Sequence, residues 1–196
     1  MAGRRLGISS SCYKFNSVKP SNVLILPGRE NSGLQHWQTL WEKRHGYMRV
    51  EQHEWARPLR GDWLARLEEM VLSRDEPAVL VAHSLGCILA AAWSARSLNT
   101  HRVKAALLVA PADVEQPEVR EQLPTWSPID LSALAFPSVL VASRNDPNCE
   151  LERARLFAHA WGAQFMDYGE CGHINAESGL ASWPEGHVLL QDLMKD

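Results

Sequence analysis

Residues 78–86 read Ala78-Val79-Leu80-Val81-Ala82-His83-Ser84-Leu85-Gly86. The apolar run at the start predicts a buried strand, and the small, apolar residues 87–93 that follow predict a helix. Between the two, the chain must turn sharply at Ser84, whose hydroxyl would then stand clear of the backbone at the carboxyl end of the strand. Ala82 and Gly86 are small enough to let strand and helix cross closely. The stretch therefore predicts a nucleophile elbow, and the alternative is an ordinary turn in which Ser84 caps the helix.

A serine nucleophile needs a base to accept its proton and an acid to orient that base. A second apolar run, residues 138–142, is followed by Asp146, and a third run, residues 164–168, leads into a glycine-containing loop that presents His173. Both residues follow predicted strands, and the chain order is serine, acid, histidine. We therefore predict that Ser84, Asp146 and His173 form a catalytic triad. His83 is expected to be structural, because neighbouring residues in an elbow point in different directions.

Four motifs of the chain are familiar from one family of enzymes: Leu26-Pro27-Gly28-Arg29, Ala82-His83-Ser84-Leu85-Gly86, Ser143-Arg144-Asn145-Asp146-Pro147 and Gly172-His173-Ile174-Asn175. In these motifs the chain resembles the small serine hydrolases typified by YdeN and retinoblastoma-binding protein nine, a branch of the α/β-hydrolases. The resemblance spans roughly residues 22–195, and it implies a serine nucleophile, an acid and a base at the three positions given above. It also implies an esterase-like reaction on simple acyl esters, without naming the physiological substrate.

A second carboxylate competes for the role of the acid. Asp113 follows the strand predicted at residues 103–110, and some hydrolases place the acid after that neighbouring strand. We favour Asp146 because the Asn-Asp-Pro sequence around it matches the motif of the family that the chain resembles.

Short apolar runs that alternate with helical patterns predict an α/β fold with three layers, a doubly wound and mostly parallel six-stranded sheet. The resemblance implies a minimal α/β-hydrolase fold with strand order 2-1-3-4-5-6, without the antiparallel first strands of larger members. Residues 111–137 hold five prolines and little periodicity, and they are the candidate lid. The strands are expected at residues 23–26, 47–52, 79–82, 103–110, 139–142 and 164–168, and the helices at 33–45, 62–73, 87–98, 150–161 and 184–194.

The oxyanion of a tetrahedral intermediate needs hydrogen-bond donors. The Leu85 N–H is expected to be one, because it follows the nucleophile at a helix N-terminus. The second is expected from the loop after the first strand, where Gly28 lets the chain turn, and we assign it to the Arg29 N–H. The substrate pocket is predicted to include His36, Trp37 and Trp126, with simple packing as the alternative role for the first two.

The composition is that of an ordinary globular protein. The chain has 196 residues, 45% of them hydrophobic and 22% charged, and a formal net charge of −3. This charge gives no reason to expect a nucleic acid or an anionic membrane as a partner. The four cysteines, Cys12, Cys87, Cys149 and Cys171, show no metal-ligand spacing, so we expect no metal and no cofactor, and reduced thiols in the cytoplasm.

The domain organisation is expected to be simple. Residues 1–20 are polar and aperiodic, and we predict a loosely attached or disordered arm without a signal peptide. Residues 21–196 are predicted to form one α/β-hydrolase domain. The sequence leaves the oligomeric state open.

The function that these patterns favour is a serine hydrolase that forms an acyl-enzyme, most simply a carboxylic-ester hydrolase acting on small-molecule acyl substrates. Thioesterase and amidase activities use the same chemistry and stay open. Two other classes are a non-catalytic interaction module that retains the fold and a lyase with the same triad.

Overall fold

The structure, a computed structural model, describes residues 19–195 and contains one sheet of six parallel strands. The strand order is β2-β1-β3-β4-β5-β6, as the resemblance implied. A parallel sheet whose order reverses beside β1 brings the loops after β1 and β3 together at its carboxyl edge. The strands are β1 (Val23–Leu26), β2 (Met48–Arg49), β3 (Ala78–His83), β4 (Val103–Val109), β5 (Ser138–Ala142) and β6 (Gln164–Asp167).

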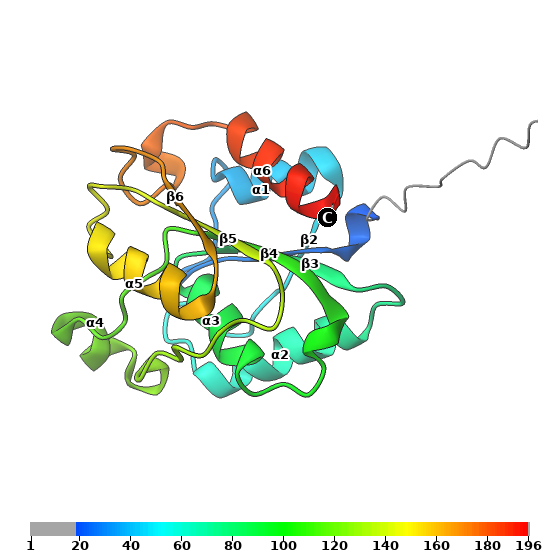
Figure 1. Ribbon diagram of the computed structural model, residues 1–196, viewed down its shortest axis with the longest axis horizontal. Coiled ribbons are helices and arrows are strands. Elements are labelled where there is room, and N and C mark those ends of the chain that lie inside the picture. Colours follow the sequence, from blue (N-terminus) through cyan, green and yellow to red (C-terminus); the bar gives the residue numbers. More distant parts are fainter. Residues whose placement is uncertain (1–18, 196) are drawn as a thin grey trace, which may run out of the picture.

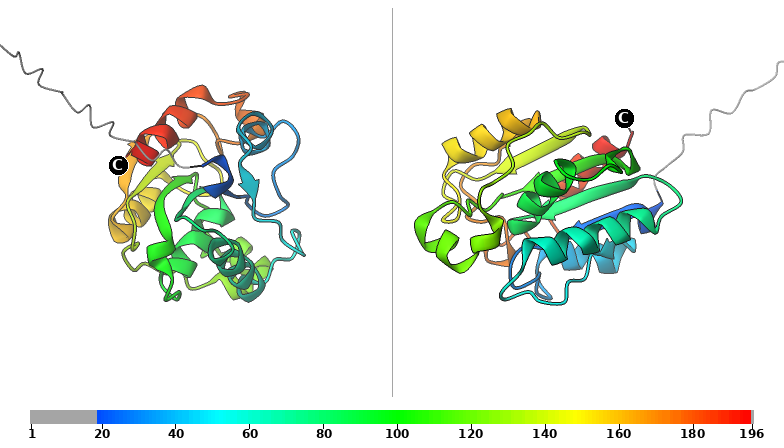
Figure 2. Two further views of the ribbon diagram at one scale, coloured as in Figure 1. Left: turned by 90° about the vertical axis from the view of Figure 1, so that its right-hand side faces the viewer. Right: turned by 90° about the horizontal axis from the view of Figure 1, so that it is seen from below.

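Helices cover both faces of the sheet, so the fold has the predicted three layers. Figure 1 shows α1 and α6 together on one face and α2, α3 and α5 on the other, and the two views in Figure 2 show the sheet between them. A further short helix, α4, stands at one end of the sheet. The helices are α1 (Trp37–His45), α2 (Arg60–Leu72), α3 (Leu85–Ser94), α4 (Pro117–Gln122), α5 (Leu151–Trp161) and α6 (Pro184–Lys195).

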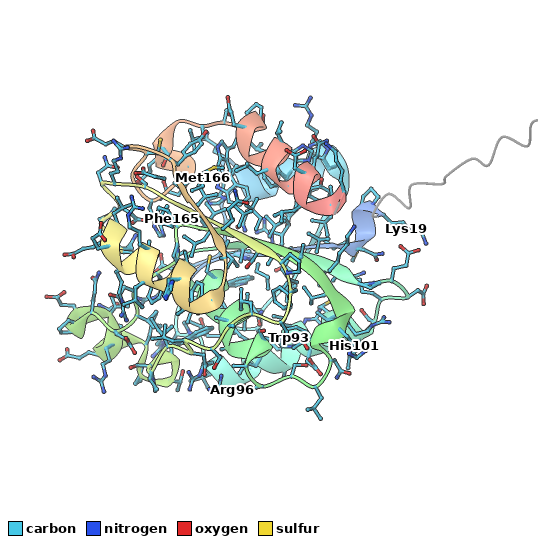
Figure 3. All side chains as sticks on the ribbon, viewed as in Figure 1. Lys19, Trp93, Arg96, His101, Phe165 and Met166 are labelled. Atoms are coloured by element: carbon cyan, nitrogen blue, oxygen red, sulfur yellow. The ribbon has the colours of Figure 1, made fainter. Side chains whose placement is uncertain are left out.

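Successive side chains of each strand point to opposite faces of the sheet, so the interior is divided into two cores. Leu80 and Ala82 of β3 belong to the core under α2, α3 and α5, whereas Val79 and Val81 belong to the core under α1 and α6. The edge strand β6 divides in the same way, since Phe165 packs against the first core and Met166 against the second (Figure 3). Both faces of the sheet are buried, which explains why its central strands read as continuous apolar runs.

Two elements near the amino end differ from the prediction. The helix expected from residue 33 begins at Trp37, because His36 has an extended backbone and its Nδ1 accepts a hydrogen bond from the Gln38 N–H. This interaction is an N-cap, which starts the helix at the following residue. The strand expected over residues 47–52 is confined to β2, a two-residue pairing at the edge of the sheet.

The predicted N-terminal arm lies mostly outside the described residues. Of the part that is described, Lys19 forms an ion pair with Glu76 at 2.9 Å, and Pro20–Asn22 form a 3₁₀ turn that leads into β1. Cys12 lies outside the described residues. Within residues 19–195, every helix is too short or too polar to cross a lipid bilayer.

Candidate active site

Ser84 occupies a sharp, strained turn between β3 and α3. Its backbone has φ 54° and ψ −120°, a conformation that costs a non-glycine residue on the order of 1–3 kcal/mol. The Ser84 N–H is held by the Val109 carbonyl at 3.0 Å, and the side chain is half-buried rather than buried like its neighbours in β3. This strand, turn and helix have the local geometry that residues 78–86 predicted.

Gly86 allows the turn to approach the neighbouring strand β1. A Cβ atom at this position would lie 2.2 Å from the Leu26 carbonyl oxygen and 2.9 Å from the Pro27 carbonyl oxygen. The close crossing is therefore between the start of α3 and the end of β1, where the backbone cannot give way.

Substituting Gly86 by Ala is expected to lower the free energy of unfolding by about 2–4 kcal/mol, because either α3 or the end of β1 must move. Gly61, in the first turn of α2, has no atom within 4 Å of an added Cβ. Gly61→Ala is therefore the matched control and should change stability by less than about 1 kcal/mol. Urea unfolding measures both variants, and equal stabilities would contradict the backbone contact at Gly86.

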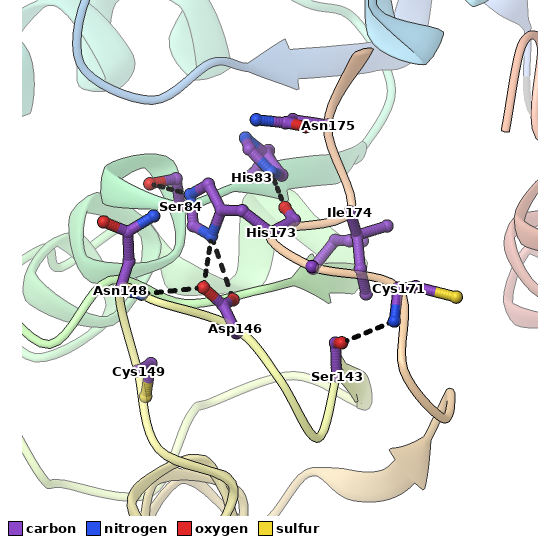
Figure 4. Close-up of polar contacts among 12 residues, drawn as sticks. His83, Ser84, Ser143, Asp146, Asn148, Cys149, Cys171, His173, Ile174 and Asn175 are labelled. Carbon is purple, nitrogen blue, oxygen red and sulfur yellow. Dashed lines mark hydrogen bonds and ion pairs between the residues drawn. The ribbon is translucent and has the colours of Figure 1, made fainter. Parts of the chain in front are cut away.

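Of the three residues predicted to form a triad, His173 lies within hydrogen-bond distance of both others. His173 Nε2 is 2.9 Å from Ser84 Oγ, and His173 Nδ1 is 2.9 Å from each carboxylate oxygen of Asp146 (Figure 4). Asp146 follows β5 and His173 follows β6, whose carboxyl ends share an edge with that of β3. The Asp146 side chain is 2% exposed and the His173 side chain 12%, so little water surrounds their contact.

The competing carboxylate, Asp113, has a different partner. Its Oδ2 forms an ion pair with Arg153 at 3.2 Å, and Arg153 also pairs with Glu115. Asp113 lies beside the candidate site, but its charge is used to hold this network. The geometry therefore favours Asp146 as the partner of His173.

The loops that carry the acid and the base are tied to each other. The Asn145 side-chain oxygen accepts hydrogen bonds from the Gly172 N–H at 2.7 Å and from the Ser143 hydroxyl at 2.9 Å. Ser143 Oγ in turn accepts from the Cys171 N–H at 2.9 Å. Ser143 and Asn145 were assigned no role of their own from the sequence, although both belong to the polar stretch between the buried strand β5 and Asp146.

A cavity of about 410 Å³ opens at Ser84. Gly28 lets the loop after β1 approach the serine closely, since a Cβ there would be 2.8 Å from Ser84 Cβ and 3.2 Å from Ser84 Oγ. Within the described residues, the N–H groups of Arg29 and Leu85 donate to no backbone carbonyl. The lining includes Ser84, His173, Arg29, Leu85, Val119 and Leu123, the last two from α4 and the residue that follows it.

The structure corrects the predicted substrate pocket, because His36, Trp37 and Trp126 do not belong to the lining of this cavity. Trp126 is fully buried in the core beside Trp63, and its indole N–H donates to the Pro58 carbonyl. His36 and Trp37 are 5% and 1% exposed in the core under α1. Residues of α4 and the residue after it line the cavity instead. This helix was not predicted, because it is too short to show a helical period in the sequence.

Burial sets the protonation of several groups near the site. It lowers the pKa of His36 to about 4, with a smaller contribution from the charge of Arg49. It also lowers the pKa of His83 well below its ordinary value, with smaller contributions from the imidazoles of His173 and His36. Burial also raises the pKa of Cys149 to about 12 and raises that of Cys87. Both histidines are therefore neutral and both thiols protonated near pH 7. Within residues 19–195, no cluster of three His, Cys, Asp or Glu side chains could hold a metal ion.

Comparisons with known proteins agree with this architecture. The sequence model of a family described as serine hydrolase matches residues 23–192. A YdeN-like hydrolase structure from Pectobacterium atrosepticum is 30% identical, with a TM-score of 0.79 over 89% of this chain and 90% of that one. The ydeN gene product of B. subtilis is 20% identical, with a TM-score of 0.73 over 90% of this chain and 100% of that one.

An esterase from Thermogutta terrifontis, Est2, shares the fold at greater distance. Its structure with propionate bound is 18% identical, with a TM-score of 0.65 over 94% of this chain and 85% of that one. The comparison with curated proteins gave no significant match. The family model spans most of the chain and the Pectobacterium relative reaches 30% identity, so the chain belongs to the serine hydrolases, as a small YdeN-like member with the α/β-hydrolase fold.

Proposed function

We propose that this hydrolase cleaves small acyl esters through an acyl-enzyme formed on Ser84, with His173 as the base and Asp146 as the orienting acid. The observation that carries the proposal is the unbroken hydrogen-bonded line from Ser84 Oγ through His173 to Asp146, at 2.9 Å for each contact. A serine hydroxyl is a weak nucleophile, and this arrangement supplies the base that activates it.

In the first half of the reaction, Ser84 Oγ attacks the ester carbonyl carbon while His173 Nε2 takes the hydroxyl proton. Asp146 accepts a hydrogen bond from Nδ1–H, which keeps Nε2 free to act as the base and stabilises the imidazolium that forms. The N–H groups of Leu85 and Arg29 are assigned to the oxyanion, because both residues line the cavity at Ser84. His173 then gives its proton to the leaving alcohol oxygen as the ester bond breaks.

In the second half, water attacks the acyl-enzyme. His173 takes a proton from the water and returns it to Ser84 Oγ when the carboxylic acid leaves, so the enzyme ends in its starting state. The cavity opens to solvent beside the triad, which gives water access to the acyl carbon.

The choice of a short acyl group is supported by the size and lining of the cavity. A volume of about 410 Å³, with Leu85, Val119 and Leu123 beside polar side chains, suits a short acyl group. Structures of the Thermogutta terrifontis esterase have been solved with propionate and with butyrate bound, which are short acyl chains of this kind.

A fluorophosphonate probe tests the proposal directly, because it phosphonylates an activated serine. We expect the folded protein to be labelled on Ser84, identified by peptide mapping, and heat-denatured protein to remain unlabelled. A matched panel of an ester, a thioester and an amide with the same acyl group should then be cleaved fastest at the ester bond. Absence of labelling would favour a non-catalytic role, and a thioester or amide cleaved faster than the ester would change the substrate class.

The kcat/KM for ester hydrolysis should level off early, or decline, as the acyl chain becomes longer. Each buried methylene contributes only about 0.8 kcal/mol, and a cavity of this size buries few of them. Nitrophenyl esters with acyl groups of about two to six carbons are expected to have higher kcat/KM than long-chain esters. An optimum at twelve carbons or beyond would require a deep tunnel, which is at odds with the cavity at Ser84.

A further inference from the structure

His83 lies between the nucleophile strand and the loop of the base. It is the last residue of β3, and the two-residue period of the strand places it on the same face as Val79 and Val81, toward α1. It is 5% exposed, and its ring centroid is 4.8 Å from those of His36 and His173. The proposed triad makes no use of this buried imidazole.

One hydrogen bond connects His83 to the base. Its Nε2 lies 2.9 Å from the backbone carbonyl oxygen of His173, and a carbonyl oxygen can only accept, so His83 Nε2 carries the proton and donates it (Figure 4). A second buried donor contacts the next carbonyl, since Trp37 Nε1–H donates to the Ile174 oxygen at 2.8 Å. Two consecutive carbonyls of the base loop are therefore held from the core under α1.

The base loop needs such anchors because its backbone is strained. Gly172 has φ 54° and Ile174 has φ 47°, so the residues on both sides of His173 lie in the left-handed region. For a β-branched residue this conformation costs on the order of 1–3 kcal/mol and persists only where the surroundings enforce it. Asn145 and Ser143 hold the amino-terminal side of the loop, whereas His83 and Trp37 hold the carboxyl-terminal side.

We propose that His83 is a positioning residue for the catalytic base: its Nε2–H fixes the backbone of His173, with Trp37 as a second anchor, and so keeps the imidazole at hydrogen-bond distance from Ser84. This inference rests on the proposed function. A displacement of about 1 Å between reacting groups can lower turnover by roughly 100-fold, so an anchor on the backbone of the base has a catalytic consequence without touching substrate. Because His83 is neutral, it adds no second positive charge beside the His173 imidazolium.

The experiment compares two substitutions of His83. His83→Phe keeps a buried ring but removes the donor, whereas His83→Gln places an amide N–H near the position of Nε2. We expect His83→Phe to lower kcat and the fluorophosphonate labelling rate by about 10–100-fold with KM within about threefold, and His83→Gln to recover most of the loss. Rates are measured below the melting transition and corrected for the folded fraction.

A second pair of variants tests Trp37, the other anchor, whether or not His83→Phe folds well. Trp37→Phe removes the indole N–H that holds the Ile174 carbonyl, together with part of the buried ring. Trp161→Phe makes the same change at a buried donor that holds the Asp130 carbonyl at 2.8 Å, away from the site. Trp37→Phe should lower kcat by about 3–10-fold, and the Trp161→Phe control should stay within about twofold of wild type. Equal activities of these two variants would overturn the role of Trp37 as an anchor.

A readout independent of hydrolysis separates this inference from the proposed function. The low-field proton resonance of the His173 Nδ1–H, held by Asp146, should be present in wild type and His83→Gln and shifted or broadened in His83→Phe. The inference would be overturned by an unchanged resonance and labelling rate in His83→Phe, or by a glutamine variant as impaired as the phenylalanine variant. Failure of the wild type to be labelled would instead overturn the proposed function, and the resonance would still show whether His83 positions the imidazole.

Discussion

Ser84→Ala is expected to abolish ester hydrolysis and fluorophosphonate labelling, lowering turnover by roughly 10⁴–10⁶-fold. The substitution removes the oxygen that is proposed to carry the acyl group, while the proposed oxyanion donors and the cavity stay in place. Alanine fills the same turn without new contacts, so the protein should remain folded. Activity on a nitrophenyl ester, labelling and the melting temperature are the three measurements.

A second serine offers the matched control. Ser138, the first residue of β5, is 7% exposed, and its hydroxyl is buried without a hydrogen-bond partner among the described residues. Ser138→Ala removes the same atom at a distance from the triad and should leave both activity and labelling unchanged. If Ser84→Ala kept more than about a tenth of the wild-type turnover, Ser84 would not be the nucleophile.

Asp146→Asn is expected to lower turnover by about 10⁴-fold. An amide in place of the carboxylate can donate a hydrogen bond to His173 Nδ1, which favours the tautomer with the proton on Nε2. That tautomer cannot accept a proton from Ser84. The loss should therefore appear in kcat, with the labelling rate reduced in parallel.

Asp113→Asn is the matched comparison, because it makes the same change in a carboxylate that lines the cavity at Ser84. Its main consequence is a weaker ion pair with Arg153, so we expect activity within about tenfold of wild type. Equal losses in the two variants, or a larger loss for Asp113→Asn, would assign the role of the acid to the residue after β4.

The sheet was predictable in detail for every strand except β2. The strands expected at residues 23–26, 139–142 and 164–168 agree with β1, β5 and β6 to within one residue at each end, because apolar runs between helical patterns leave little choice of pairing. The edge strand β2 is shorter than predicted, since only Met48 and Arg49 pair with β1. The start of α1 was also misplaced, because a histidine is an unusual N-cap.

For the candidate site, the sequence indicated the residues that follow strands but not those that surround them. Ser84, Asp146 and His173 could be predicted because each follows a separate parallel strand, and such strands end at one edge. His36 and Trp37 were predicted to line the pocket because they follow the predicted oxyanion loop in the sequence. Trp126 was predicted to line it because it lies in the candidate lid, residues 111–137. Side-chain direction decides between pocket and core, and the packing of α1 and the residues 111–137 turns all three inward.

The sequence by itself indicated the groups that the proposed chemistry needs: a serine in a sharp turn, an acid and a histidine, each after a strand of the parallel sheet. These features depend on local periodicity and residue type, which a single chain displays directly. Only the tertiary structure decided which groups hold the base, because Asn145, His83 and Trp37 reach the loop of His173 from three separate elements. Contacts between residues far apart in the chain depend on how the layers pack, and that packing leaves no periodic signal in the sequence.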